Sequence, residues 1–110
     1  MEINEIFIEG LTINQAEIER KIATELDIGL LQVRSTVDLL KDGSTIPFIS
    51  RYRKEATGNL DEVQVRDINH KLLFHENIET RRIEIIKSIF GQGKLTEELY
   101  QNIAKATTYK

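Results

Sequence analysis

Hydrophobic positions recur along this chain at the spacing of α-helices, and the first such stripe follows a clear start signal. Asn14, with Glu17 three residues later, is a variant of the capping box and predicts where a helix begins. Aliphatic side chains then recur every four residues, which places them on one helical face: Ile18, Ile22 and Leu26. Gly29 follows at a position suited to a left-handed C-cap. This pattern predicts a first helix over residues 14–28.

Two further amphipathic segments follow. The second stripe is closed by Gly43 and predicts a helix over residues 30–42, with a face made of Leu30, Val33, Val37 and Leu40. Pro47 then restarts the chain, because proline is tolerated in the first turn of a helix and keeps the residue before it out of the helical region. A third helix is therefore predicted over residues 47–56, ended by Thr57, Gly58 and Asn59.

The fourth predicted helix is the longest. Asp61 and Gln64 give a second N-cap signal, and no glycine or proline interrupts the chain from there to Gly91. The helix is therefore predicted over residues 62–90. Its apolar side chains gather towards its two ends, and the segment from His75 to Arg82 is a polar middle. Such a pattern is expected where one helix spans two packing regions.

The two ends of the chain complete the predicted architecture. Residues 1–13 carry no sustained stripe and are interpreted as a variable or flexible extension. A last helix is predicted over residues 97–106, with Thr96 as its N-cap and a face made of Leu99, Ile103 and Ala106. No segment alternates apolar and polar residues with the period of two typical of a half-buried strand. The predicted fold class is all-α, with about five helices, one long helix near residues 62–90 and no sheet.

Length and composition narrow the class of protein. A chain of 110 residues and 12.7 kDa is one domain. The absence of cysteine excludes disulfide scaffolds, thiolate zinc sites and cysteine nucleophiles. Apolar runs of four residues or fewer leave no transmembrane helix and no signal-peptide core, so we expect a soluble, cytoplasmic protein without a membrane partner.

The charge is unevenly distributed. The net charge is −3, but residues 1–42 carry nine acidic and four basic side chains, whereas residues 43–110 carry nine acidic and eleven basic ones. A dedicated nucleic-acid module usually has a strong basic excess, because phosphate neutralisation supplies much of its affinity. This chain has only a local basic cluster.

The sequence contains no motif typical of an enzyme or a metal site. His70 and His75 are five residues apart, about 140° around a helix, and cannot share a metal ion. His75 and Glu79 lie one turn apart and could touch, but a single pair is not a zinc site. The run from Gly91 to Lys94 lacks the preceding strand and the Lys-Ser/Thr pair of a phosphate loop. We expect no catalytic residue, no metal and no cofactor.

One cluster could bind a ligand: Arg51, Tyr52, Arg53 and Lys54, in the helix that begins at Pro47. Guanidinium groups beside an exposed aromatic ring can contact phosphate and stack on bases. The alternative is structural: Tyr52 packs inward with Phe48, four residues earlier, and the cations pair with nearby carboxylates, which are those of Glu55, Asp61 and Glu62. The sequence leaves both interpretations open.

Three segments resemble a known family. The run TIPFISRYRKEATGNLDEVQ, from Thr45 to Gln64, closely resembles the signature of the Tex family of bacterial transcription accessory proteins. The preceding LDIGLLQVRSTVDLLKDG and the later RRIEIIKSI and GQGKLTEEL resemble the blocks that flank it. The resemblance covers about residues 17–108. It identifies residues 14–108 as the N-terminal helical domain of a Tex-like protein, and residues 1–13 as a lineage-specific extension.

The resemblance implies a function for the longer protein. Tex-like proteins continue into a ribonuclease H-like domain, helix-hairpin-helix elements and an OB-type RNA-binding domain, so this chain is interpreted as a fragment. The implied function is a helical scaffold and interaction module of an RNA- or DNA-binding transcription accessory protein, without catalytic activity of its own. Its partners would be nucleic acid, bound through the full-length protein, and the downstream domains. The alternative is a protein-interaction module that contacts the transcription machinery without touching nucleic acid.

Overall fold

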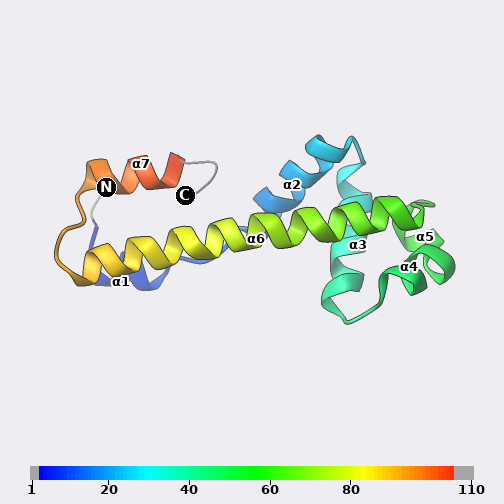
Figure 1. Ribbon diagram of the computed structural model, residues 1–110, viewed down its shortest axis with the longest axis horizontal. Helices are drawn as coiled ribbons and strands as arrows, with labels where there is room; N and C mark the ends of the chain where they lie inside the picture. The colour runs from blue at the N-terminus through cyan, green and yellow to red at the C-terminus, as the bar shows by residue number, and fades with distance from the viewer. Residues whose placement is uncertain (1–2, 106–110) are drawn as a thin grey trace. The chain divides into compact units, whose positions relative to one another are not determined.

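The computed structural model describes residues 3–105 and shows seven helices and no strand within that range (Figure 1). The all-α prediction is confirmed, although about five helices were expected. In chain order the helices are α1 (Glu5–Glu9), α2 (Gln15–Leu26), α3 (Leu30–Lys41), α4 (Ile46–Tyr52), α5 (Lys54–Thr57), α6 (Glu62–Gly91) and α7 (Glu97–Lys105).

The chain forms two compact units, and α6 contributes to both. Among the described residues, 14–75 form one unit, while 3–13 and 76–105 form the other. The division lies at the polar middle of α6, where the sequence predicts a change of packing region. The capping box at the start of α6 is confirmed, because Asp61 Oδ1 accepts from the Gln64 N–H at 2.8 Å and Gln64 Oε1 accepts from the Asp61 N–H at 3.0 Å.

The unit of residues 14–75 has a core built from the aliphatic stripes. Its buried apolar residues are Ile18, Ile22, Ile28, Val33, Val37, Leu39, Ile49, Leu60, Val65, Ile68 and Leu72. These come from α2, α3, α4, the first part of α6 and the connections between them. Burying such a contiguous set of aliphatic side chains is the main favourable term that holds short helices together.

The junction between α2 and α3 differs from the prediction. Asp27, not Gly29, takes the left-handed C-cap conformation, with φ 53° and ψ 48°. Gly29 is instead the N-cap of α3, and its N–H donates to Gln32 Oε1 at 3.1 Å. Gly29 is held by the following helix, and a Cβ at this position would lie 2.9 Å from Gln32 Oε1, so a larger residue would require the end of the Gln32 side chain to shift.

The helix predicted over residues 47–56 is interrupted. Arg53, with φ −125° and ψ 35°, ends α4 and precedes α5. Beyond this break the Thr57 side chain is fully buried, and its hydroxyl accepts from the Leu60 N–H at 3.3 Å. We attribute the break to this burial, because tertiary packing routinely overrides local helix propensity. Thr45 caps α4, since its hydroxyl accepts from the Phe48 N–H at 3.3 Å, and Pro47 lies in the first turn, as predicted.

Gln32 ties the end of α5 to the start of α3. Its Nε2 donates to the backbone oxygens of Thr57 and Gly58 at 3.1 and 3.2 Å. Gly58 has φ 66°, and a Cβ there would lie 2.8 Å from Gln32 Nε2. The segment that carries the basic cluster is therefore fixed at its C-terminal end by one side chain from α3.

The second unit contains a helix that the sequence does not reveal. Within the segment interpreted as a variable or flexible extension, α1 is capped by Asn4 and buries Ile8. The Phe7 ring meets the Tyr100 ring of α7 edge-on, with centroids 5.4 Å apart. Thr96 is confirmed as the N-cap of α7, since its hydroxyl accepts from the Leu99 N–H at 3.1 Å. Ala106, predicted to lie on the face of this last helix, falls outside the described residues.

Candidate nucleic-acid interface

The short helix α4 presents one face to solvent. At 3.6 residues per turn, Phe48, Arg51 and Tyr52 lie within about 100° of one another around its axis. All three are exposed, whereas Ile49 and Ser50, on the opposite side, are buried. Helix α4 therefore has an inward side with Ile49 and Ser50 and an outward side with two aromatic rings and a guanidinium group.

The two rings on this outward face lie next to each other in solvent. Phe48 is 43% exposed and Tyr52 is 68% exposed. Their ring centroids are 5.5 Å apart, with an angle of 47° between the planes. The predicted neighbour relation is confirmed, but the alternative in which Tyr52 packs inward is wrong, because Ile49 and Ser50 occupy the buried side of α4.

The cations of the cluster differ in their partners. Arg53 is held by Glu55, with 2.8 Å between Nε and Oε1. Arg51 and Lys54 are exposed, and neither forms an ion pair with another of residues 3–105. The structural interpretation therefore holds for Arg53 alone. The other two carboxylates proposed as partners are engaged elsewhere, since Asp61 caps α6 and Glu62 pairs with Arg66 at 2.7 Å.

Arg51 is unusual among the arginines of this chain. All seven lie in the described range, and six of them contact a carboxylate: Arg20, Arg34, Arg53, Arg66, Arg81 and Arg82. Arg51 is the exception among residues 3–105, and it shares its helix face with Phe48 and Tyr52. A guanidinium group without a carboxylate partner keeps all its donors available for a phosphate.

The pairing of Arg53 has a consequence for titration. The Arg53 hydrogen bond lowers the pKa of the Glu55 carboxyl, with help from the Glu55 backbone N–H. We expect Arg53→Ala to raise the pKa of Glu55 towards its ordinary value, because the largest stabilising contact of the carboxylate is lost. Carbon-detected NMR titration of the glutamate carboxyls measures this shift. A Glu55 pKa that does not change in the variant would contradict the ion pair.

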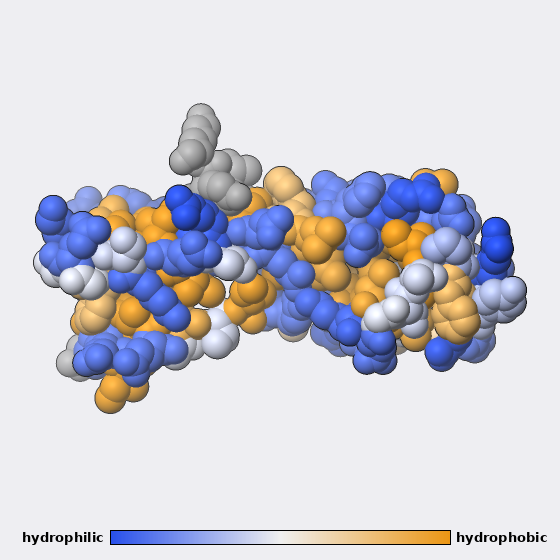
Figure 2. Space-filling model, turned by 60° about the horizontal axis from the view of Figure 1, so that its bottom comes forward, coloured by the Kyte–Doolittle hydropathy of each residue, from blue (hydrophilic) through white to orange (hydrophobic). Residues whose placement is uncertain are grey.

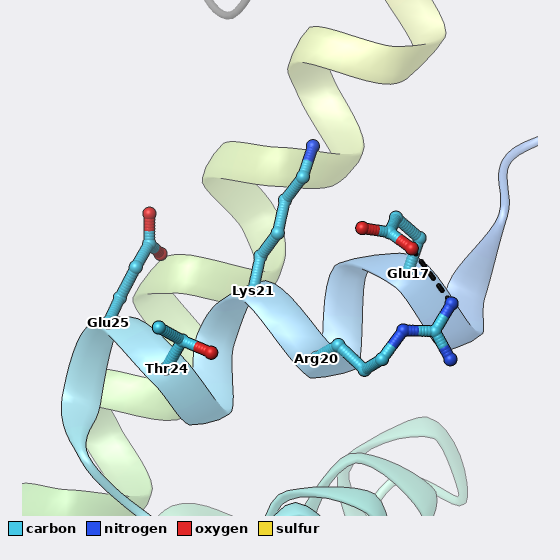
Figure 3. A pocket seen from close by; sticks show the side chains of 5 residues that line it. All are labelled: Glu17, Arg20, Lys21, Thr24 and Glu25. Atoms are coloured by element: carbon cyan, nitrogen blue, oxygen red, sulfur yellow. Dashed lines mark hydrogen bonds and ion pairs between the residues drawn. The ribbon is translucent and has the colours of Figure 1, made fainter.

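Several other charged groups pair with one another or line an open hollow. Along α2, an open hollow of about 260 Å³ is lined by side chains that include Glu17, Arg20 and Lys21 (Figure 3). Arg20 turns to Glu17 at 2.8 Å and lowers the pKa of that carboxyl. His75, which lies one turn before Glu79 on α6, is buried, and its Nε2 lies 2.8 Å from Glu25 Oε1 of α2. Glu79 pairs with Arg82 at 2.6 Å, at the i, i+3 spacing of the two residues.

Neither a cluster of metal-ligating side chains nor a membrane-spanning helix is found in the described range. Within residues 3–105, no group of three or more His, Cys, Asp or Glu side chains is placed to hold a metal ion. None of the helices described is both long enough and apolar enough to cross a membrane.

Apolar side chains also reach the surface away from α4 (Figure 2). On α6, Leu73 and Phe74 are each about half exposed. In the second unit, a hollow of about 440 Å³ is lined by Leu11, Thr12, Ile13, Thr80, Ile83, Glu84 and Lys87. At this end of α6, Ile86 is buried, while Ile83, Ile89 and Phe90 are partly exposed.

Comparison with known proteins shows which family the chain belongs to. The model of the Tex-like protein N-terminal domain matches residues 16–90, which include α3, α4 and α5 and all but one residue each of α2 and α6. The chain belongs to this Tex N-terminal domain family. The basic cluster and the exposed rings of α4 lie inside the matched region, whereas α1 and α7 lie outside it.

Individual relatives agree with the family assignment. The chain is 49% identical over 96 residues to Protein tex of Bordetella pertussis and 43% identical over 89 residues to Transcriptional accessory protein Tex of Neisseria gonorrhoeae, which covers 87% and 81% of this chain. It is also 33% identical over 76 residues, 69% of the chain, to S1 RNA-binding domain-containing protein 1 of Pongo abelii. The aligned regions cover 12%, 12% and 8% of these relatives, so the chain spans only a small part of their length.

Proposed function

We propose that this Tex N-terminal domain is a non-catalytic helical scaffold and interaction module of a transcription accessory protein, and that α4 contacts nucleic-acid phosphate. The observation that carries the phosphate contact is the exposed Arg51, which has no carboxylate partner within residues 3–105 and lies beside an exposed aromatic ring. Lys54 adds a second exposed cation at the start of α5.

The names of the relatives support a role in transcription with a nucleic-acid contact. Two of them are named as Tex proteins, one of these as a transcriptional accessory protein, and a third is named for an S1 RNA-binding domain. In this proposal the domain supplies an accessory contact, because its net charge is −3 and its basic groups are local. A surface of that kind would add to the affinity and orientation of nucleic acid bound elsewhere in the longer protein.

The proposal predicts a loss of binding in a variant of the cluster. We expect Arg51→Ala/Arg53→Ala/Lys54→Ala to bind RNA and DNA oligonucleotides more weakly than the native chain, because up to three phosphate contacts are removed. Fluorescence anisotropy at low salt measures the change in affinity.

A charge-matched variant provides the control. Arg20→Ala/Lys21→Ala/Lys94→Ala removes the same formal charge from exposed positions outside the cluster and should weaken binding less. Equal losses in the two variants would assign binding to overall charge and not to α4. Unchanged affinity with a lowered melting temperature in the cluster variant would indicate structural pairing instead.

The apolar side chains exposed on α6 favour a second candidate function. Leu73 and Phe74 are half exposed although both are large and apolar. Exposed apolar side chains that form a patch commonly mark protein contacts. In this alternative the domain binds the transcription machinery or the downstream domains through α6, without a nucleic-acid contact. A Leu73→Ser/Phe74→Ser variant that keeps its oligonucleotide affinity but loses a protein partner of the native chain would support it.

A further inference from the structure

We propose that the outward face of α4 binds single-stranded nucleic acid by stacking an unpaired base on the Phe48–Tyr52 ring pair, with Arg51 and Lys54 on the adjacent phosphates. This inference rests on the phosphate contact proposed above and adds the class of ligand and two residues that contact its bases. Phe48 lies outside the four-residue basic cluster that the sequence singles out.

The first observation is the exposure of the two rings. Phe48 and Tyr52 are the only exposed aromatic residues that neighbour each other within residues 3–105, with centroids 5.5 Å apart. The third exposed ring, Phe74, is approached by Lys71, whose Nζ lies 5.9 Å from its centroid. Among the described residues, no cation lies over the ring of Phe48 or Tyr52. These two rings are therefore accessible to a flat ligand such as a base.

The second observation is the charge that surrounds the rings. Arg51 lies one turn after Phe48 on the same face, and Lys54 follows Tyr52 by two residues. Neither cation is neutralised by a carboxylate of the described residues, in contrast to the other six arginines. An apolar protein surface would not need these cations, whereas a strand with one phosphate per nucleotide is complementary to them.

The third observation is that the face is held in place before binding. Ile49 has no exposed surface, and the Ser50 hydroxyl donates to the Pro47 carbonyl at 3.2 Å. Thr45 caps the start of α4, and Gln32 fixes the end of α5. A ligand would thus meet rings on an anchored helix, and little ordering free energy would be lost on binding.

These observations favour a single strand over a duplex. Base faces are covered by their neighbours in a duplex, whereas an unpaired base can lie on an aromatic side chain. Stacking requires an accessible base face, and the phosphate contacts require negative charge. RNA and DNA single strands have both, so the proposal applies to either. The order of affinity expected for the native chain is single strand, then duplex, then an abasic strand of equal length at the same salt concentration.

The test compares ring variants of the 110-residue chain on three probes by fluorescence anisotropy: a single-stranded oligonucleotide, prepared as RNA and as DNA, an abasic strand and a duplex. Tyr52→Ala and Phe48→Ala should each weaken binding to both single strands by about 5- to 100-fold and leave binding to the abasic strand unchanged. Tyr52→Phe, which keeps the ring, should bind like the native chain. Both rings are exposed, and circular dichroism melting checks that each variant is folded.

Each other outcome contradicts a defined part of the proposal. If Arg51→Gln/Lys54→Gln weakens binding while the ring variants do not, the phosphate contact stands and stacking is wrong. If neither changes the affinity, the phosphate contact and stacking are both wrong, and the exposed rings are assigned to a protein contact. An equal loss on the abasic strand would mean that the rings only position the cations, which also overturns stacking.

Discussion

Replacement of Ile49 by alanine is expected to lower the free energy of unfolding by about 2–5 kcal/mol. We also expect α4 to lose its fixed position, so that the basic cluster is no longer held in place. Ile49 has no exposed surface and anchors the inward side of α4, while the rings and Arg51 project from the other side. The lost methylene groups leave a cavity that the packed helices around it can fill only in part. Urea unfolding followed by circular dichroism measures the change.

A nearby aliphatic residue supplies the control for this prediction. Leu31 lies at the start of α3 in the same unit and is 74% exposed, so Leu31→Ala should change the stability by no more than about 0.5 kcal/mol. Equal destabilisation by the two substitutions would contradict the assignment of Ile49 to the core.

The second large effect concerns the ion pair between α2 and α3. Glu19 is 8% exposed, and its Oε1 accepts from Arg34 Nε at 3.1 Å. Arg34→Ala should destabilise the chain by about 2–3 kcal/mol, because a poorly solvated carboxylate then has lost its charged partner. Thermal unfolding at neutral pH measures the loss.

The double variant separates the pair from simple side-chain loss. Glu19→Leu/Arg34→Ala removes both charges and should be more stable than Arg34→Ala alone, since no carboxylate remains to be desolvated. As a surface comparison, Arg66→Ala should cost no more than about 0.5 kcal/mol, because Arg66 and Glu62 are both about half exposed. A double variant that is less stable than Arg34→Ala would contradict the explanation that the loss comes from an unpaired carboxylate.

The helical framework could be predicted because its signals are local. Asn14, the Asp61–Gln64 pair and Thr96 each satisfy backbone N–H groups a few residues away, so the starts of α2, α6 and α7 follow from short stretches of sequence. A local signal does not predict the cap where two neighbouring residues can each take the capping conformation. Asp27 and Gly29 both suit a left-handed cap, and the contact of Gly29 with Gln32 decided the choice.

Features that depend on distant contacts could not be predicted. The break at Arg53 coincides with the burial of Thr57, and the Glu25–His75 pair joins residues fifty positions apart. Helix α1 has only five residues, too few for a periodic stripe to be recognised.

The candidate site was predicted in composition but not in detail. The run of cations and the Phe48–Tyr52 spacing are visible in the sequence, yet which cation stays available depends on the choice among several nearby carboxylates. Side-chain geometry determines these ion pairs, and in the structure Glu55 pairs with Arg53 and Glu62 pairs with Arg66. The exposure of Tyr52 likewise depends on which side of α4 is buried, and the structure buries the side of Ile49 and Ser50.

The salt dependence of single-strand binding tests the central claim most directly. For single strands, the slope of log K against log salt is about −0.7 per phosphate contact. If Arg51 and Lys54 each contact a phosphate, Arg51→Gln/Lys54→Gln should reduce the magnitude of this slope by about 1.4 relative to the native chain. A native chain whose affinity is independent of salt, or a variant with the native slope, would contradict a nucleic-acid contact at α4.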